Sequence, residues 1–330
     1  MPKLLTANSG SYPRIGDSEE LQILRKTFAG MDKGEKTEKD LVQAQNKVTE
    51  WAVTDQAAAN LDFVTDGQIR WNDPISHLLR GLANVEINGL LRFFDTNFYF
   101  RQPVIKGKVV PGAPKLVEEF KIAQGFSKTA VKPVLTGPFT LAHLSILQSG
   151  YLNAAALAED LAAVVASEVD ALVKAGATLI QIDEPFIFRA PDQFKVLEAA
   201  IQKVAKAKGS AQIALHTYFG DASSLYSKLQ TLPVDILGID FSYNPKLIDQ
   251  IAAEGSSKAL GLGLLDGRNT KIENAADVIK QLEKLFPKIS APVSFLNPSS
   301  GLEYLPRDRA QRKLALLKAV KDQFQGGSKS

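Results

Sequence analysis

Residues 171–185 read ALVKAGATLIQIDEP and contain a helix end, a buried strand and a polar strand exit. A helix is predicted over residues 154–175, where apolar side chains recur with a period near 3.6, and Gly176 favours its termination. The apolar run at residues 177–182 is typical of a strand buried on both faces of a parallel sheet. Asp183 and Glu184 follow it, and side-chain alternation along a strand sends only one of the two carboxylates inward.

The same strand-then-helix unit recurs along the chain. Its apolar runs are residues 3–7, 61–65, 131–135, 177–182, 212–215, 235–239, 259–265 and 291–296. Eight βα units favour an α/β fold of the (β/α)₈ TIM-barrel type over an open sheet. Further helices are expected over residues 18–60, with a break near 30–34, and over 307–324. We expect a single domain over residues 1–325 and a flexible tail at 326–330.

One connection, residues 66–130 after the second strand, is too long for a simple loop. It contains an aromatic cluster with interleaved arginines: Arg92, Phe93, Phe94, Phe98, Tyr99, Phe100 and Arg101. Long insertions at the C-terminal end of a barrel commonly act as lids or substrate walls. The same aromatics would also suit a small hydrophobic hairpin packed on the barrel rim. The sequence leaves both interpretations open.

Composition excludes several functional classes. The 330 residues include 39 basic and 36 acidic side chains, and a net charge of +3 gives no field suited to nucleic acid. No run of about 18 apolar residues predicts a membrane span, and residues 1–16 do not resemble a signal peptide, so we expect a cytoplasmic protein. Cysteine is absent, which excludes disulfides, thiolate nucleophiles and cysteine-ligated metal sites.

Polar residues follow every predicted strand, at the end of a barrel where catalytic groups gather. The exits are residues 8–16, 66–73, 136–140, 183–185, 216–218, 240, 266–269 and 297–301. A single residue of this kind commonly caps a helix or forms a turn. Because eight exits converge, we predict that the ring as a whole is functional. His77 and His143 lie outside it, in leucine-rich helical segments, and are predicted to be partly buried and hydrogen-bonded.

Several exit segments, in order along the chain, resemble motifs of the cobalamin-independent methionine synthase family. They are residues 10–16 (GSYPRIG), 66–68 (DGQ), 72–73 (ND), 135–140 (LTGPFT), 181–185 (QIDEP) and 297–298 (NP). The ordered set covers nearly the whole chain as one barrel, similar to a short, single-barrel relative. The resemblance implies methionine biosynthesis, with methyl transfer to homocysteine sulfur inside a (β/α)₈ barrel.

The resemblance also implies substrate-binding residues. Ser11 and Asp183 match the family residues that hold the polar end of the amino-acid substrate. Gln68 occupies the position of a family glutamate, and it keeps an acceptor oxygen but lacks the charge that would pair with an ammonium. Arg14 and Arg101 are candidates for binding an anionic substrate or donor tail. The predicted binding set is completed by Glu184, Gly137 and Asn297.

The family's zinc ligands do not carry over. The positions of the His-x-Cys pair fall on Tyr218 and Gly220, that of the glutamate on Asp240, and that of the last cysteine on Ser300. A family histidine that acts as a catalytic acid corresponds to Arg268. We therefore expect no zinc site. The segments after the fifth, seventh and eighth strands resemble instead the metal-free N-terminal barrel of the longer family members.

Three hypotheses follow. The first is a methyltransferase that takes a methyl group from a folate or corrinoid donor, such as methylcobalamin, to homocysteine or a related small thiol. Without zinc, its catalytic residues would be His216 as a base, Arg268 as an electrostatic partner, and Asp240. The second is a non-catalytic protein on a metal-free barrel that binds a small molecule, a corrinoid or a protein partner. The third is a rebuilt metal site from His216, Asp183 or Glu184, and Asp240.

Overall fold

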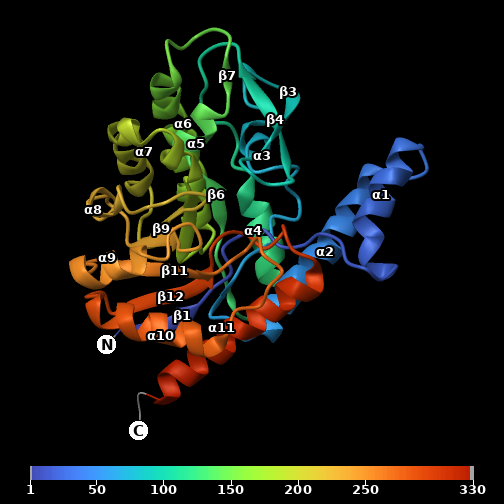
Figure 1. The fold of residues 1–330 in the computed structure, drawn as a ribbon. Coiled ribbons are helices and arrows are strands. Elements are labelled where there is room, and N and C mark those ends of the chain that lie inside the picture. The colour runs from blue at the N-terminus through green and yellow to red at the C-terminus, as the bar shows by residue number, and fades with distance from the viewer. Residues whose placement is uncertain (1, 328–330) are drawn as a thin grey trace.

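The computed structural model describes residues 2–327 and shows parallel strands surrounded by helices, an α/β fold (Figure 1). All eight predicted apolar runs form strands. They are β1 (Lys3–Thr6), β2 (Phe63–Val64), β5 (Ala130–Val131) with β6 (Val134–Thr136), β8 (Leu179–Asp183), β9 (Gln212–Thr217), β10 (Ile236–Asp240), β11 (Ala259–Leu265) and β12 (Val293–Pro298). The third run is split in two at Lys132 and Pro133, because proline has no N–H for the ladder.

The strands follow one another around a ring. Seven form a parallel sheet in the order β1-β12-β11-β10-β9-β8-β6, and β2 pairs with β5. A single bridge from Ala7 to Phe63 connects β1 to β2, and the chain itself connects β5 to β6. The predicted TIM-barrel architecture is confirmed, with regular hydrogen bonding interrupted around the short second strand and the split third strand.

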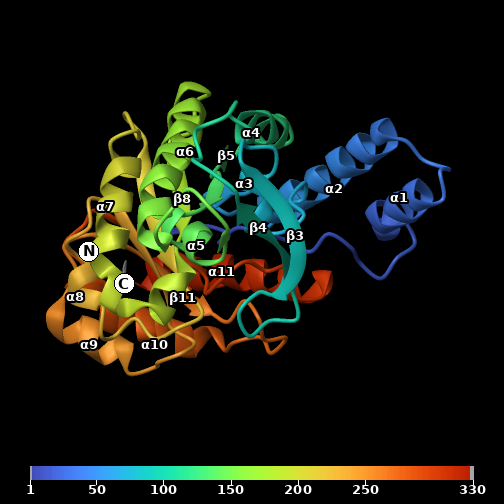
Figure 2. The same cartoon turned by 90° about the horizontal axis from the view of Figure 1, so that it is seen from above.

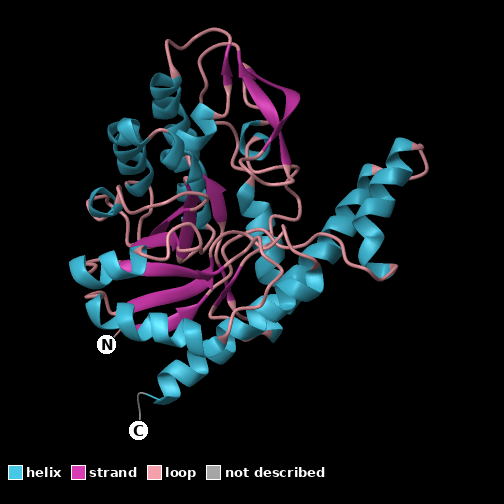
Figure 3. Ribbon diagram, viewed as in Figure 1, coloured by secondary structure: helices cyan, strands magenta, loops and turns pink. Residues whose placement is uncertain are grey.

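Helices cover the outside of the ring (Figure 3). The α-helices are α1 (Ile23–Asp32), α2 (Glu38–Ala58), α3 (Ser76–Leu79), α4 (Leu116–Gly125), α5 (Pro138–His143), α6 (Ala154–Lys174), α7 (Phe194–Ala205), α8 (Tyr226–Leu229), α9 (Leu247–Glu254), α10 (Ala275–Leu285) and α11 (Arg307–Gly327). Short 3₁₀ helices occupy η1 (Glu20–Gln22), η2 (Pro185–Arg189), η3 (Pro191–Gln193) and η4 (Phe286–Lys288). None of the helices within residues 2–327 has the length and apolar character needed to cross a bilayer.

Two terminal features refine the sequence-based picture. The helical segment expected over residues 18–60 is a helical hairpin of α1 and α2 that projects from the barrel (Figure 2). A capping box between Thr37 and Asp40 starts α2 after the predicted break. At the other end, α11 extends to Gly327, so residues 326 and 327 of the predicted tail are helical. Residues 328–330 lie outside the described part of the chain.

The long connection at residues 66–130 contains an antiparallel hairpin of β3 (Val85–Arg92) and β4 (Tyr99–Ile105). β7 (Ile146–Leu147), from the segment after α5, adds a parallel strand beside β4. The last part of the connection, α4, contacts α2 and α6 as an outer barrel helix. The hairpin and its tip are therefore the part that departs from the βα repeat.

Alternation along the strands separates two environments. On β8, Leu179 belongs to a small apolar cluster inside the ring, whereas Ile180 and Ile182 belong to the large core between strands and helices. Leu179, Gln181 and Asp183 therefore share the inner side of β8, with the apolar cluster at the N-terminal end of the strands. The polar residues lie above that cluster, toward the C-terminal ends.

Candidate active site

A buried hydrogen-bond network connects Asp183 to the exit of β1 and to β9 with its exit. The side-chain N–H groups of Gln181 donate to Asp183 Oδ1 (2.7 Å) and to the carbonyl of Ser9 (2.6 Å). Gln181 Nε2 also lies 3.1 Å from His216 Nδ1, and the hydroxyl of Tyr218 donates to Asp183 Oδ2 (3.3 Å). Asp183 and His216, predicted from separate strand exits, are thus neighbours, with Nδ1 3.9 Å from Oδ1.

Burial shifts both titratable groups of this pair. It raises the pKa of Asp183 above the usual range of an aspartate, and the hydrogen bond from Gln181 opposes the rise. Burial, and then the charge of Lys132, lower the pKa of His216 to about 3. His216 is therefore neutral at pH 7 and a weak base. Its ring has room because the neighbouring residue is Gly238, where a Cβ would lie 2.6 Å from the imidazole.

The loop after β12 closes over the exit of β1. The N–H of Leu302 donates to the carbonyl of Ser11 (2.8 Å), and a Cβ at Gly301 would collide with the Ser11 hydroxyl. Glu303, which the sequence analysis missed, has a side chain only 6% exposed and pairs with Arg14 (3.3 Å). The Ser11 side chain is also hydrogen-bonded to Glu303, so Glu303 contacts both Ser11 and Arg14 on one side of the ring.

Glu184 faces away from the ring, as strand alternation allows for only one of the two carboxylates. Its oxygens accept the N–H groups of Phe139 (2.9 Å) and Thr140 (2.7 Å) at the start of α5. Gly137 makes room for it, since a Cβ there would overlap the carboxylate. Burial raises the pKa of Glu184 to about 7. Glu184 thus packs against Gly137 and accepts hydrogen bonds from α5. Both residues support the site from outside and do not line it.

Asp240 and Arg268 lie apart from His216. The Asp240 carboxylate accepts the N–H of Phe219 (3.2 Å) and both the N–H (2.8 Å) and the hydroxyl (2.5 Å) of Ser242. The Arg268 guanidinium is stacked between Phe219 and Tyr243, at 4.7 and 5.1 Å from the ring centroids. Within residues 2–327, no hydrogen bond or ion pair joins either residue to His216. Geometry therefore does not bring the three predicted catalytic residues together.

The remaining binding candidates have different surroundings. Asn297 is buried and donates to the Ser9 hydroxyl (3.1 Å) and the carbonyl of Pro298 (2.7 Å), so it belongs to the network. Gln68 is buried in a left-handed backbone conformation, with φ +52°. Arg101 is exposed on β4, and its N–H donates to Asp73 Oδ2 (3.1 Å).

The tip of the hairpin covers the ring. Phe93 and Phe94 are buried and pack edge-on against Phe219. Phe98 meets Tyr304, from the loop after β12, with ring centroids 4.8 Å apart. The aromatics therefore pack as a hairpin tip on the barrel rim, as one of the two interpretations expects, and their role as a lid stays a prediction.

Two cavities flank the ring pair of Phe98 and Tyr304, and both residues line both of them. The first has a volume of about 610 Å³ and is also lined by Arg14, Asn72 and Glu303. The second has a volume of about 450 Å³, with Asp95, Asp266 and Arg268 among its lining residues. The barrel rim thus has two cavities, separated by one aromatic contact.

The residues present do not fit the zinc site of the family that the motifs resemble. The Tyr218 hydroxyl donates a hydrogen bond to Asp183. The Asp240 carboxylate oxygens accept hydrogen bonds from the backbone N–H groups of Phe219 and Ser242. A Cβ at Gly220 would overlap Phe188, so no ligand side chain fits there. Among residues 2–327, no three His, Cys, Asp or Glu side chains lie together as a metal site. The rebuilt site considered from the sequence is not formed either.

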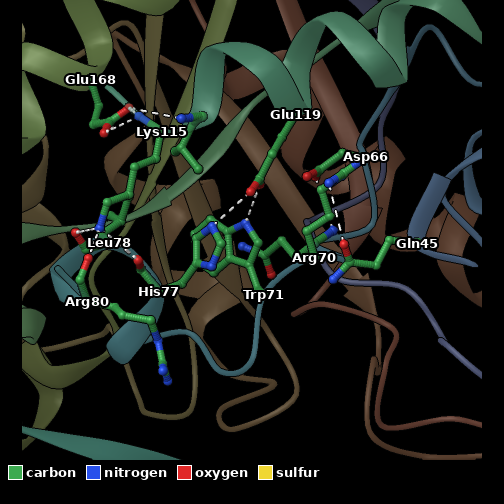
Figure 4. Close-up of polar contacts among 12 residues, drawn as sticks. Gln45, Asp66, Arg70, Trp71, His77, Leu78, Arg80, Lys115, Glu119 and Glu168 are labelled. Carbon is green, nitrogen blue, oxygen red and sulfur yellow. Dashed lines mark hydrogen bonds and ion pairs between the residues drawn. The ribbon is translucent and has the colours of Figure 1, made fainter. Parts of the chain in front are cut away.

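A second polar cluster lies outside the ring, at the base of the hairpin (Figure 4). Glu119 accepts hydrogen bonds from Trp71 Nε1 (3.0 Å) and His77 Nε2 (3.0 Å), and the two rings are stacked 4.6 Å apart. His143, elsewhere, contacts the carbonyl of Phe139 (2.8 Å) and Gln193 (3.0 Å). The prediction that both histidines are partly buried and hydrogen-bonded is confirmed, and the Glu119 cluster anchors α3 to α4.

Comparison with known proteins identifies the family. Residues 75–290 match the family model described as cobalamin-independent synthase, N-terminal domain. The methionine synthase of Sulfurisphaera tokodaii is 33% identical over 321 residues, which cover 95% of this chain and 90% of that protein. That of Saccharolobus solfataricus is 30% identical over 316 residues, covering 95% and 92%. This chain belongs to the cobalamin-independent methionine synthase family.

Solved structures show the same fold. A B12-independent methionine synthase from Shewanella sp. W3-18-1, in complex with selenomethionine, has a TM-score of 0.79 at 20% identity over 98% of both chains. A putative one from Listeria monocytogenes has a TM-score of 0.73 at 18% identity over 98% of both chains. The cobalamin-independent methionine synthases are methyltransferases, so the recognised motifs belong to a methyl-transfer family. The matched residues 75–290 include the exits of the fifth and seventh strands, where the match to an N-terminal-domain model agrees with the resemblance noted; the exit of the eighth strand lies outside the match.

Proposed function

We propose that this chain methylates the sulfur of homocysteine or a related small amino-acid thiol. The observation that carries the proposal is Asp183, a buried carboxylate at the inner end of β8 with no cation in direct contact among the described residues. A buried carboxylate held by neutral donors is suited to pair with an incoming ammonium group. The hydroxyl of Ser11 and the amide of Gln68 would bind the rest of the amino-acid end.

Family relatives support a methionine-like ligand, since the Shewanella enzyme was solved with selenomethionine, the selenium analogue of the methylated product. The cavity of about 610 Å³ beside the ring offers room for a folate methyl donor, whereas a corrinoid is too large to enter it and would dock at its opening. Methylation forms a carbon–sulfur bond and breaks the bond between the methyl group and N5 of the folate, or the cobalt of the corrinoid. The thiol proton ends on N5 of the departing folate, or in solvent when a corrinoid is the donor. His216 is a weak base, and the family's zinc ligands are absent from this chain. We therefore assign thiolate stabilisation to Arg268, a cation that lines the cavity of about 450 Å³.

The test is methyl transfer by the purified chain. Homocysteine is incubated with methyltetrahydrofolate in one arm and methylcobalamin in another, and methionine is measured by mass spectrometry. We expect product in at least one arm, and its loss in Asp183→Asn, which keeps the shape but removes the charge. No product above the D183N background in either arm would refute the proposal.

A second candidate function is small-molecule binding without catalysis. The specific observation in its favour is that residues at the family's zinc positions make other hydrogen bonds: Tyr218 donates to Asp183, and Asp240 accepts from Ser242. Calorimetry separates the two candidates. Micromolar binding of L-methionine or L-homocysteine, combined with no turnover from either donor, would favour the binding protein.

A further inference from the structure

Lys132 is a charged residue inside the barrel, one layer below Asp183. It lies between β5 and β6, is 4% exposed, and lines an internal cavity of about 20 Å³ together with Gln181 and His216. Branched apolar side chains usually fill this part of a TIM barrel. Burying an ammonium costs free energy because its hydration is lost. No ion pair among residues 2–327 includes Lys132, so the cost is not offset by a direct carboxylate partner.

The partner of Lys132 connects it to the site. Its ammonium donates to Gln181 Oε1, while Gln181 Nε2 donates to Asp183 Oδ1 (2.7 Å) and to the carbonyl of Ser9 (2.6 Å). An ammonium can only donate hydrogen bonds, so Gln181 must turn its oxygen toward Lys132. Its N–H groups are then directed toward Asp183 and Ser9. Lys132 therefore fixes the orientation of the Gln181 side-chain amide.

Lys132 also supplies the positive charge near Asp183. The other titratable groups that face this carboxylate are His216, Tyr218, Tyr304 and Glu184. Burial keeps His216 neutral by lowering its pKa to about 3, and it raises the pKa of both tyrosines. Burial also raises the pKa of Asp183, and the charge of Lys132 opposes this rise. Among the described residues that face Asp183, Lys132 alone favours its ionised form by charge.

We propose that Lys132 is a positioning residue that, through Gln181, holds Asp183 oriented and ionised to receive the ammonium group of the ligand. The ligand part of this inference rests on the proposed function. The coupling of Lys132 to Asp183 does not, because it is a property of the free protein. The two parts can therefore be tested by separate measurements.

The coupling is tested by titrating Asp183 directly. Carboxyl ¹³C NMR of the aspartate-labelled chain follows its ionisation, with the signal assigned from Asp183→Asn. Lys132→Met, which keeps the length of the side chain but removes the charge and the donors, should move the Asp183 titration to higher pH by about one unit or more. The control is Lys321→Met, which removes a largely buried lysine paired with Asp62 (2.6 Å), before β2. That variant should leave the titration unchanged.

The ligand part is tested with L-methionine by calorimetry. Lys132→Met should weaken binding about tenfold at pH 7. The effect should be smaller at pH 8.5, because burial lowers the pKa of Lys132 to about 8 and the unaltered chain has then also lost most of the lysine charge. If the unaltered chain does not bind L-methionine, the proposed function fails while the NMR titration still tests the coupling. Should K132M not fold, Lys132→Gln can still donate to Gln181 and tests the charge alone. An unchanged Asp183 titration in folded K132M or K132Q would overturn the inference.

Discussion

Removing the ring of Phe98 should loosen the cover over the site. Phe98 is partly buried and meets Tyr304 edge-on, with centroids 4.8 Å apart and an interplanar angle of 79°. Such a ring pair contributes about 0.5–1.5 kcal/mol, and half-burial of a phenylalanine contributes about 1 kcal/mol more. Phe98→Ala should therefore cost the closed state about 2 kcal/mol, which raises the open population about thirtyfold.

Hydrogen exchange and binding kinetics test this expectation. The amide of Phe93 donates to the carbonyl of Phe98 (2.8 Å) at the base of the tip, so its exchange reports on opening. In Phe98→Ala we expect this amide to exchange at least tenfold faster, and L-methionine to associate faster. Leu90→Ala, which truncates a side chain 60% exposed on the same hairpin, is the control and should change neither. If F98A matches the unaltered chain in both, the ring pair does not restrain the cover.

Three further expectations follow from the site. Glu184→Gln should lower the free energy of unfolding by about 1–3 kcal/mol, because its amide cannot accept both N–H groups of α5; unchanged denaturant unfolding would contradict this. Since burial raises the pKa of Glu184 to about 7, the folded chain holds more protons than the unfolded chain between about pH 4.5 and 7. Stability should therefore fall as pH rises through that window, and less steeply in E184Q. Arg268→Ala should reduce methyl transfer at least tenfold with little change in melting temperature, and equal rates would remove Arg268 from the proposal. Dialysis against a chelator should change neither the melting temperature nor L-methionine binding, and a drop in either with loss of stoichiometric metal would contradict the geometric argument.

The fold could be predicted because its signals are local. Each barrel strand is an apolar run that ends in a polar exit, and the boundaries of α6 (Ala154–Lys174) differ by one residue from the predicted helix. The choice between Asp183 and Glu184 also follows from local alternation, which allows one carboxylate inside. What the pattern could not predict is the split of the third strand at Lys132 and Pro133, where the apolar run looks continuous enough for one strand.

The site was less predictable because its contacts are between distant segments. Lys132 looks like an ordinary interruption of an apolar run, and its importance depends on Gln181, which approaches it only after β6 and β8 pair. Period-two alternation could have found Gln181, since it shares a face with Asp183. Glu303 could not have been found in this way, because it lies in a loop whose path over Ser11 depends on the closed ring.

The contacts that complete the site join the two ends of the chain. Ser9 is bonded to Asn297, and Phe98 meets Tyr304. During synthesis, the first strands emerge long before the residues that close over them, so a nascent chain lacking β12 has neither the complete network nor its cover. Bringing the two ends of the chain together lowers the chain entropy, and this cost precedes the contacts that offset it. The binding site should thus be among the last parts of the molecule to form, and ligand affinity can serve as a sensitive measure of completed folding.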